Sequence, residues 1–337
     1  MARYVVVGQG IAGSLLSYFL YKNRQNFVVY DPGLGSATSA AGGLLNPITG
    51  KQFAKSWMAD TLMPFAKTTY RELEQLLQVS FYHERRFLKV LQNVKEQNDY
   101  FLRAADEGYS AYFPNPGVVE TDAVLQPFGC IEVNGCAQLS TPVFLPAYRS
   151  FLRQHQFLVE ENWEAAKKKD DDIVIYCDGY MAQQPEHPFS YLPWQLAKGE
   201  HLLVRLPHFP KNTIIKGATM LAPTADAHIF YAGATYQWHF ETLLPTEEKR
   251  VEILSSLKKM LPFEPEITGA GAGVRPAVRD RRPLIGRHPE QSDLYLFNGL
   301  GTKGFSLAPY FAQELAAHLL HQQPLTPEIN LQRFSKV

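Results

Sequence analysis

The sequence contains little cysteine and no excess of charge of either sign. Its 337 residues include three cysteines, Cys130, Cys136 and Cys177, without a CxxC spacing or a nearby pair of histidines. Neither a metal site nor a disulfide framework is therefore indicated, and a reducing compartment fits best. Lysine plus arginine and aspartate plus glutamate both number 33. The chain thus lacks the basic excess that is typical of nucleic-acid-binding proteins.

Long uninterrupted apolar runs are also missing. Residues 1–21 come nearest, but glycines interrupt them, and polar residues follow at 22–24 where a secretory leader would carry small ones. No other segment reaches the roughly 18 apolar residues of a membrane-spanning helix. We therefore expect a cytoplasmic protein without membrane contact. The length suits one large or two interleaved domains, and 45% apolar with 20% charged residues is an ordinary globular composition.

The first 31 residues carry a strand, turn, helix and strand pattern. Residues 4–7 are a β-branched apolar run, typical of a parallel strand buried on both faces. A GxGxxG motif follows, then apolar residues at helical spacing, then a second apolar run over residues 27–30. This order predicts a dinucleotide-binding βαβ unit. The expected cofactor contacts of the motif are Gly8, Gly10, Ile11, Ala12 and Gly13.

Each part of this unit has a physical task. Gly8 permits the tight turn, Gly10 lets the backbone approach a pyrophosphate, and Gly13 lets helix and strand pack closely. The helix N-terminus presents free N–H groups and a positive dipole end to the phosphates. Asp31, at the tip of the second strand, would accept hydrogen bonds from the adenosine ribose and argues against the 2′-phosphate of NADP.

Small residues after the second strand favour FAD over NAD. Residues 36–47 can run close against a bulky ligand and donate hydroxyl and backbone N–H hydrogen bonds. On composition alone this could also be a flexible surface loop. The stretch resembles the flavin-embracing loop of the D-amino-acid oxidase and glycine oxidase superfamily. The cofactor-binding residues expected here are Ser36, Ser39, Ala40, Gly42, Gly43 and Leu44.

The rest of the chain predicts two interleaved domains. Helices are expected over residues 56–78, 95–107, 142–155 and 247–261, and extended segments over 81–91, 157–159, 173–177 and parts of 194–234. Parallel-type strands recur near residues 173 and 294. We expect an α/β fold in which a Rossmann-type FAD-binding domain is interleaved with an α+β substrate domain built on an antiparallel sheet. The former comprises residues 1–78, 140–185 and 268–337, and the latter residues 79–139 and 186–267.

The C-terminal third holds the densest set of candidate residues. Residues 294–309 read as a strand, a glycine-rich turn and a helix, whose start we place near Ser306 because proline is tolerated in a first turn. Gly273-Val-Arg-Pro276 and residues 299–309 look like the closing segments of glycine oxidase and its amine-oxidising relatives. Segments near residues 179, 198–200 and 233–236 also resemble segments of these enzymes and follow one another in the same order. Residues 50–140 resemble them only loosely.

The resemblance implies an FAD-dependent oxidoreductase acting on an amino acid or secondary amine that bears a carboxylate. Hydride transfer from the carbon beside nitrogen to flavin N5 would leave an imine that water hydrolyses. Arg275 matches the arginine that pairs with the substrate carboxylate, a task for which a planar guanidinium is suited. Tyr236 matches a position near the substrate, and Thr302 lies where glycine oxidase has an arginine. The residues alone also allow a structural ion pair of Arg275 with Asp280 or another acid, and a Tyr236 side chain packed on its strand.

The family also implies how the cofactor is held. No cysteine or histidine stands at a position of covalent attachment, so FAD should be noncovalent. Oxygen or another acceptor could reoxidise it, and a small amine or amino acid is the expected partner. Neither His201 nor His239 is expected to be catalytic. The remaining cofactor-binding candidates are Asp178, Gly179, Arg275, Gly299, Gly301, Thr302, Lys303 and Gly304.

Two other functions stay open. Residues 299–304 and 279–280 also look like the FAD domain of the bifunctional tRNA wobble-uridine modification enzyme, which removes a carboxymethyl group by the same amine oxidation. The neutral net charge disfavours a tRNA partner, although Lys51, Lys55, Arg85 and Arg86 could form a basic patch. A flavin-retaining protein that serves binding or assembly is the third reading, disfavoured by the intact glycine motif and Arg275.

Overall fold

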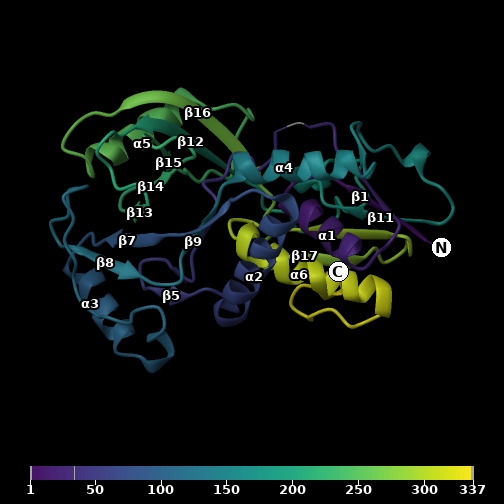
Figure 1. The fold of residues 1–337 in the computed structure, drawn as a ribbon, viewed down its shortest axis with the longest axis horizontal. Coiled ribbons are helices and arrows are strands. Elements are labelled where there is room, and N and C mark those ends of the chain that lie inside the picture. Colours follow the sequence, from purple (N-terminus) through teal and green to yellow (C-terminus); the bar gives the residue numbers. More distant parts are fainter. Residues whose placement is uncertain (1, 34, 335–337) are drawn as a thin grey trace.

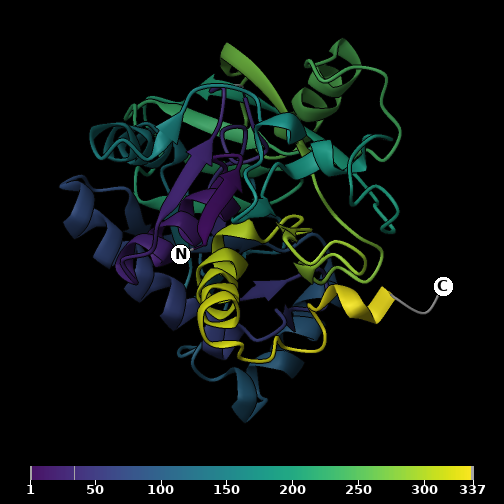
Figure 2. The same ribbon diagram turned by 90° about the vertical axis from the view of Figure 1, so that its right-hand side faces the viewer.

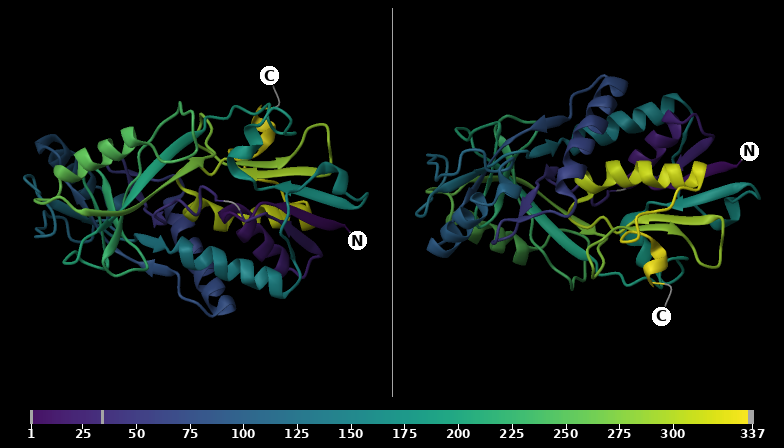
Figure 3. Two further views of the ribbon diagram at one scale, coloured as in Figure 1. Left: turned by 90° about the horizontal axis from the view of Figure 1, so that it is seen from above. Right: turned by 90° about the horizontal axis from the view of Figure 1, so that it is seen from below.

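Two sheets lie in different halves of the molecule (Figure 1), and the views from above and below separate the same two lobes (Figure 3). The computed structural model describes residues 2–33 and 35–334. The N-terminal strands form the sheet of one lobe, and strand β16 belongs to the sheet of the other. Within the described residues, no helix is both long enough and apolar enough to cross a membrane.

The first sheet has six strands in the order β10-β2-β1-β11-β18-β17. All neighbouring pairs are parallel except β17 with β18. Val5 and Val6 in β1 are fully buried, as predicted for a strand covered on both faces. The strands span Leu158–Val159 (β10), Phe27–Tyr30 (β2), Arg3–Val7 (β1), Asp172–Tyr176 (β11), Leu294–Asn298 (β18) and Leu284–Arg287 (β17).

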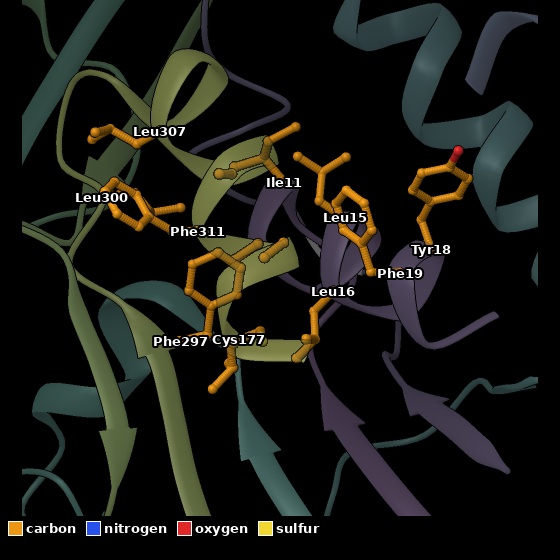
Figure 4. Packing of buried hydrophobic residues seen from close by; sticks show 14 of the residues in the cluster. Ile11, Leu15, Leu16, Tyr18, Phe19, Cys177, Phe297, Leu300, Leu307 and Phe311 are labelled. Carbon is orange, nitrogen blue, oxygen red and sulfur yellow. The ribbon is translucent and has the colours of Figure 1, made fainter. Parts of the chain in front are cut away.

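Four helices share the main hydrophobic core with this sheet. They are α1 (Ile11–Lys22), α2 (Ala59–Leu77), α4 (Thr141–Gln154) and α6 (Gly304–His321). Side chains of α1, such as Leu15, belong to one buried cluster with Phe311 of α6 and Phe297 of β18 (Figure 4). The last described element, the 3₁₀ helix η4 (Leu331–Phe334), lies beside the edge strand β17 (Figure 2).

The second sheet has seven strands in the order β16-β12-β15-β14-β13-β7-β8. Its neighbours are antiparallel, as predicted, except that β7 and β13 are parallel because a long connection brings them together. Helix α5 (Glu247–Lys258) packs on this sheet. The strands span Glu266–Arg275 (β16), Ala197–Arg205 (β12), Ile229–Gly233 (β15), Met220–Pro223 (β14), Thr213–Lys216 (β13), Arg86–Val90 (β7) and Cys130–Val133 (β8).

The chain also forms two small sheets and several short helices. A three-stranded sheet consists of β3 (Leu44–Leu45), β9 (Ala137–Leu139) and β6 (Tyr82–Glu84), and a two-stranded sheet consists of β4 (Ile48–Thr49) and β5 (Ala54–Lys55). The remaining helices are α3 (Val94–Ala104), η1 (Glu107–Tyr109), η2 (Ala165–Lys167) and η3 (Gly179–Gln183).

Sheet membership suggests one change to the division into domains. Strand β16 hydrogen-bonds to β12 from Arg205 to Ala197, so residues 268–275 belong to the seven-stranded sheet. We propose that the last FAD-binding segment begins after Arg275 and that the other boundaries stay as expected from the sequence. Arg275, the last residue of β16, then stands at the junction of the two domains.

The start of α6 differs from the sequence prediction. The helix begins at Gly304, not near Ser306, and Pro309 lies in its second turn. A proline there leaves the carbonyl of Phe305 without its intrahelical N–H donor. The Tyr70 hydroxyl donates to this carbonyl at 2.7 Å, which satisfies the acceptor from α2. The prediction was wrong because it could not include this contact between distant residues.

Candidate functional site

The glycine motif shapes the start of α1 as the sequence predicted. A β-carbon on Gly13 would overlap the carbonyl oxygen of Gly8, and Gly8 itself has φ +98° and packs against the carbonyl of Cys177. Gly10 is the extended N-cap residue and provides no side-chain cap. The Ile11 N–H donates to the Thr38 hydroxyl at 3.0 Å. Only backbone atoms and small side chains thus lie close to the N-terminus of α1 in this turn. A pyrophosphate site requires such a turn.

The carboxylate of Asp31 is held at the end of β2. Its oxygens accept hydrogen bonds from the backbone N–H groups of Gln9 and Gly33, both at 2.7 Å. The Arg149 guanidinium also donates to it at 2.7 Å. Each carboxylate oxygen can accept more than one bond, so the group can also accept from ribose hydroxyls. Sequence reasoning missed Arg149, which gives no local signal because it lies on α4, 118 residues from Asp31.

The loop after β2 crosses the face of the second sheet. Ser36 and Ser39 bond to each other, since the Ser36 N–H donates to Ser39 Oγ at 2.9 Å. Ala40 packs so closely on β16 that a β-carbon on Gly273 would lie 2.8 Å from the Ala40 methyl carbon. A β-carbon on Gly42 would contact Tyr231 of β15 at 3.1 Å. The small residues therefore permit the close approach of loop and sheet.

A cavity of about 240 Å³ lies between this loop, the strands β12, β14, β15 and β16, and the start of α6. It brings together many of the residues predicted from the sequence. Gly199, Tyr231 and Phe305 also line it and were not predicted. The predicted residues in its wall are Ala40, Gly42, Gly43, Leu44, Arg275, Thr302 and Lys303.

Arg275 lacks a carboxylate partner among the described residues. Its guanidinium donates one long hydrogen bond, of 3.3 Å, to the carbonyl of Thr235. Burial lowers the pKa of Arg275, because a cation without a counter-charge is disfavoured away from water. Asp280 pairs instead with Arg333 at 2.9 Å, so the alternative of an Arg275–Asp280 ion pair is wrong. The Arg275 guanidinium can therefore bind an anion that lies in the cavity.

Tyr236 lies beside Arg275 but not in the wall of the cavity. The guanidinium carbon of Arg275 is 5.4 Å from the centroid of its ring. The side chain is 48% exposed, which argues against a tyrosine packed on its strand. It can shield the guanidinium or contact a bound molecule.

The turn before α6 places a second cation at the cavity. Lys303 donates to Ser56 Oγ at 2.7 Å, and burial together with Arg282 and Arg281 lowers its pKa. A β-carbon on Gly304 would lie 3.3 Å from the Ile11 side chain, so α6 begins next to α1. The positive N-terminal ends of α1 and α6 and the Lys303 side chain therefore lie close together, and this arrangement favours a negatively charged group between them.

Other predicted residues have structural positions near this region. Asp178 and Gly179 follow β11 beside Gly8. The Asn298 side chain donates to the Gly179 carbonyl at 2.8 Å, and Gly299 has φ +70° at the end of β18. The Gly301 N–H donates to the Pro276 carbonyl at 2.9 Å. Asp178, Gly179, Gly299 and Gly301 do not themselves line the cavity, whereas Thr302, which follows Gly301, does.

The two candidate histidines lie in different surroundings. His201 stacks on Tyr231 with ring centroids 4.4 Å apart, and burial lowers its pKa to about 4. It is therefore neutral near pH 7. His239 is exposed in the loop that follows β15. In the described part of the chain, no group of three or more histidine, cysteine, aspartate or glutamate side chains could hold a metal ion.

The suggested basic patch does not assemble as a set of free cations. Lys55 pairs with Asp60 at 2.9 Å and Arg86 with Glu132 at 3.0 Å. Arg85 donates to Gln138 at 3.1 Å. Only Lys51 of the four projects from an exposed turn without such an interaction among the described residues. The patch therefore gives little support for phosphate binding.

Comparison with known proteins identifies the family. The family model for FAD dependent oxidoreductases (DAO) matches residues 3–318, so the chain belongs to this family and is an FAD-dependent oxidoreductase. It is similar to the glycine oxidase of Bacillus subtilis, at 25% identity over 90% of this chain and 89% of that protein. It is also similar to the tRNA 5-methylaminomethyl-2-thiouridine biosynthesis bifunctional protein of Marinobacter nauticus, at 24% identity over 98% of this chain but 57% of that protein.

Solved structures show the same fold. Glycine oxidase from Bacillus cereus has a TM-score of 0.79 at 19% identity and covers 96% of both chains. Iminodiacetate oxidase from Chelativorans has a TM-score of 0.76 at 18% identity and covers 98% of both. The expected α/β fold, the superfamily and the FAD dependence are thereby confirmed.

Proposed function

We propose that this FAD-dependent oxidoreductase of the DAO family oxidises the C–N bond of a small amine or amino acid that bears a carboxylate. One observation carries the proposal: the Arg275 guanidinium lines the cavity and has no carboxylate partner among the described residues. A carboxylate of the substrate would supply the missing counter-charge. The similarity to glycine oxidase supports the same substrate class.

The residues of this chain fit FAD. The close backbone packing at Gly8 and Gly13 and the held carboxylate of Asp31 suit the pyrophosphate and ribose, and the cavity wall suits the ring system. When bound, FAD supplies the acceptor for the hydride. We propose noncovalent binding. Cys136 and Cys177 are buried, and burial raises the pKa of both thiols, which disfavours a reactive thiolate.

Each candidate residue then has a defined task. Arg275 anchors the carboxylate and so fixes the position of the neighbouring carbon. Tyr236 covers the guanidinium from the outer side. Lys303 and the start of α6 hold positive charge at the other wall, where they can stabilise an anionic ring or substrate. No strong general base is needed if the amine arrives neutral.

Anaerobic bleaching of the flavin absorbance tests the proposal. Glycine, sarcosine, proline and D-amino acids are each mixed with the wild-type enzyme and with Arg275→Ala. Reduction by at least one of them, lost in the variant, is the expected result. Admitting oxygen to the reduced enzyme then shows whether oxygen is the acceptor.

An RNA-borne amine is the alternative substrate. Its support is the similarity to the tRNA-modifying protein, whereas the neutral net charge and the paired Lys55 and Arg86 oppose it. If the whole panel fails while dithionite reduces the bound flavin, carboxymethylaminomethyl-modified tRNA becomes the substrate to test.

A further inference from the structure

A second and larger cleft, of about 990 Å³, is lined by Lys198, whose neighbour in the chain, Gly199, lines the candidate substrate cavity. Its wall comes from η3, from residues 194–198 at the start of β12, and from the loop that joins β15 to α5. We call it the aromatic cleft, after Trp194, Trp238 and Phe240 in its wall. None of these three residues has a task in the proposed function.

A row of side chains connects the aromatic cleft to Arg275. The Tyr236 ring contacts the Arg275 guanidinium at 5.4 Å on one side and the Trp238 ring, at 5.2 Å between centroids, on the other. Tyr236 is 48% and Trp238 54% exposed. Large aromatic side chains that lie side by side and are about half exposed to solvent are typical of surfaces that bind a ligand. A molecule held at Arg275 can therefore extend along Tyr236 to Trp238.

The polar groups of the cleft indicate which ligand it suits. The buried Lys198 ammonium is already paired, with Glu200 at 2.7 Å and with the carbonyl of Leu244 at 2.6 Å. Glu241 and Glu248 add negative charge to the wall. Such a cleft disfavours a phosphate-rich ligand and favours a neutral or cationic ring, which can stack on the indoles.

We propose that the aromatic cleft binds an aromatic, neutral or cationic substituent on the amine nitrogen of a substrate whose carboxylate rests on Arg275. This inference rests on the proposed function and narrows its substrate class to N-arylalkyl amino acids. The carboxylate would fix one end of the substrate, and the ring of Trp238 would receive the other.

Binding of two unreactive analogues tests the inference directly. (Methylthio)acetate and (benzylthio)acetate replace the amine nitrogen by sulfur and differ in the substituent alone. Calorimetric titration of the FAD-loaded enzyme should show tighter binding of the benzyl compound. Trp238→Ala should reduce that preference about tenfold, the size expected for loss of an aromatic contact. Trp238→Phe should restore most of the preference, and Phe263→Ala, which removes another exposed ring, should leave it unchanged.

Kinetics with sarcosine and N-benzylglycine separate this inference from the proposed function. The ratio of their kcat/KM values should favour N-benzylglycine in the wild type and fall about tenfold in Trp238→Ala. If both amines reduce the flavin but the ratio and the binding preference do not change in the variant, the cleft assignment is wrong and the proposed function stands. If neither reduces it and Arg275→Ala has no effect on analogue binding, the proposed function fails and the cleft assignment with it.

Discussion

The guanidinium of Arg275 fills the space that a β-carbon on Gly199 would occupy. The two residues belong to the neighbouring strands β16 and β12, where Gly199 pairs with Gly273. The absence of a side chain at residue 199 thus determines where the charge of Arg275 lies. Sequence reasoning identified Arg275 but not this requirement.

Gly199→Ala should therefore weaken carboxylate binding without unfolding the protein. The new methyl group would displace the guanidinium, and the loss of charge-assisted hydrogen bonds should raise the Kd of (methylthio)acetate by about tenfold or more. Titration calorimetry measures this. Gly117→Ala, at a position with open space around the glycine, is the matched control. Equal effects of the two substitutions would contradict the assigned relationship.

Gly13→Ala should lose FAD. Its methyl group would overlap the carbonyl oxygen of Gly8, so the turn that faces the pyrophosphate must move. The ratio of flavin to protein absorbance after purification should fall at least tenfold, with the far-ultraviolet circular dichroism retained. A variant that still binds FAD stoichiometrically would refute the assignment of this turn.

His201 should make the fold sensitive to acid. Its pKa, lowered by burial to about 4, lies below the ordinary value near 6.5, so the unfolded chain takes up the proton first as the pH falls. The contribution of neutral His201 to the free energy of unfolding is complete above about pH 6.5 and is lost as the pH falls towards 4. Between pH 7.5 and pH 5 the free energy of unfolding should drop by roughly 2 kcal/mol more in the wild type than in His201→Phe. Urea denaturation at both pH values measures it, and equal losses would disprove the effect.

Tyr70 and Pro309 should be energetically coupled. The Tyr70 hydroxyl satisfies the Phe305 carbonyl that Pro309 deprives of its helical donor, in a fully buried position. Tyr70→Phe should cost about 1–3 kcal/mol of stability. In a Pro309→Ala background the restored N–H should reduce that cost to less than 1 kcal/mol. A double-mutant cycle by urea denaturation tests this, and an unchanged cost would exclude the coupling.

Much of the fold could be predicted because its signals are local. The buried strands, the glycine motif and the helix periodicity each lie within a few residues, and the structure confirms α1, α2, α4 and α5 close to their expected ranges. The predicted loop and turn residues, such as Gly42 and Thr302, also meet in one cavity.

What could not be predicted depends on contacts between distant residues. Arg149 reaches Asp31 from α4, and Tyr70 allows Pro309 to stand in the second turn of α6. The pairing of β16 with β12 places Arg275 in the second sheet rather than in the first. Periodicity and motif spacing contain no information on such partners, because these depend on how the two sheets pack.

The most direct test of the account compares a carboxylate substrate with its carboxamide. For the amine that best reduces the flavin, kcat/KM is measured for both forms with the wild type, Arg275→Lys and Arg275→Ala. We expect the wild type to prefer the carboxylate at least a hundredfold, Arg275→Lys to keep part of this preference, and Arg275→Ala to lose it. An undiminished preference in Arg275→Ala would show that another group binds the carboxylate, and the central claim would be wrong.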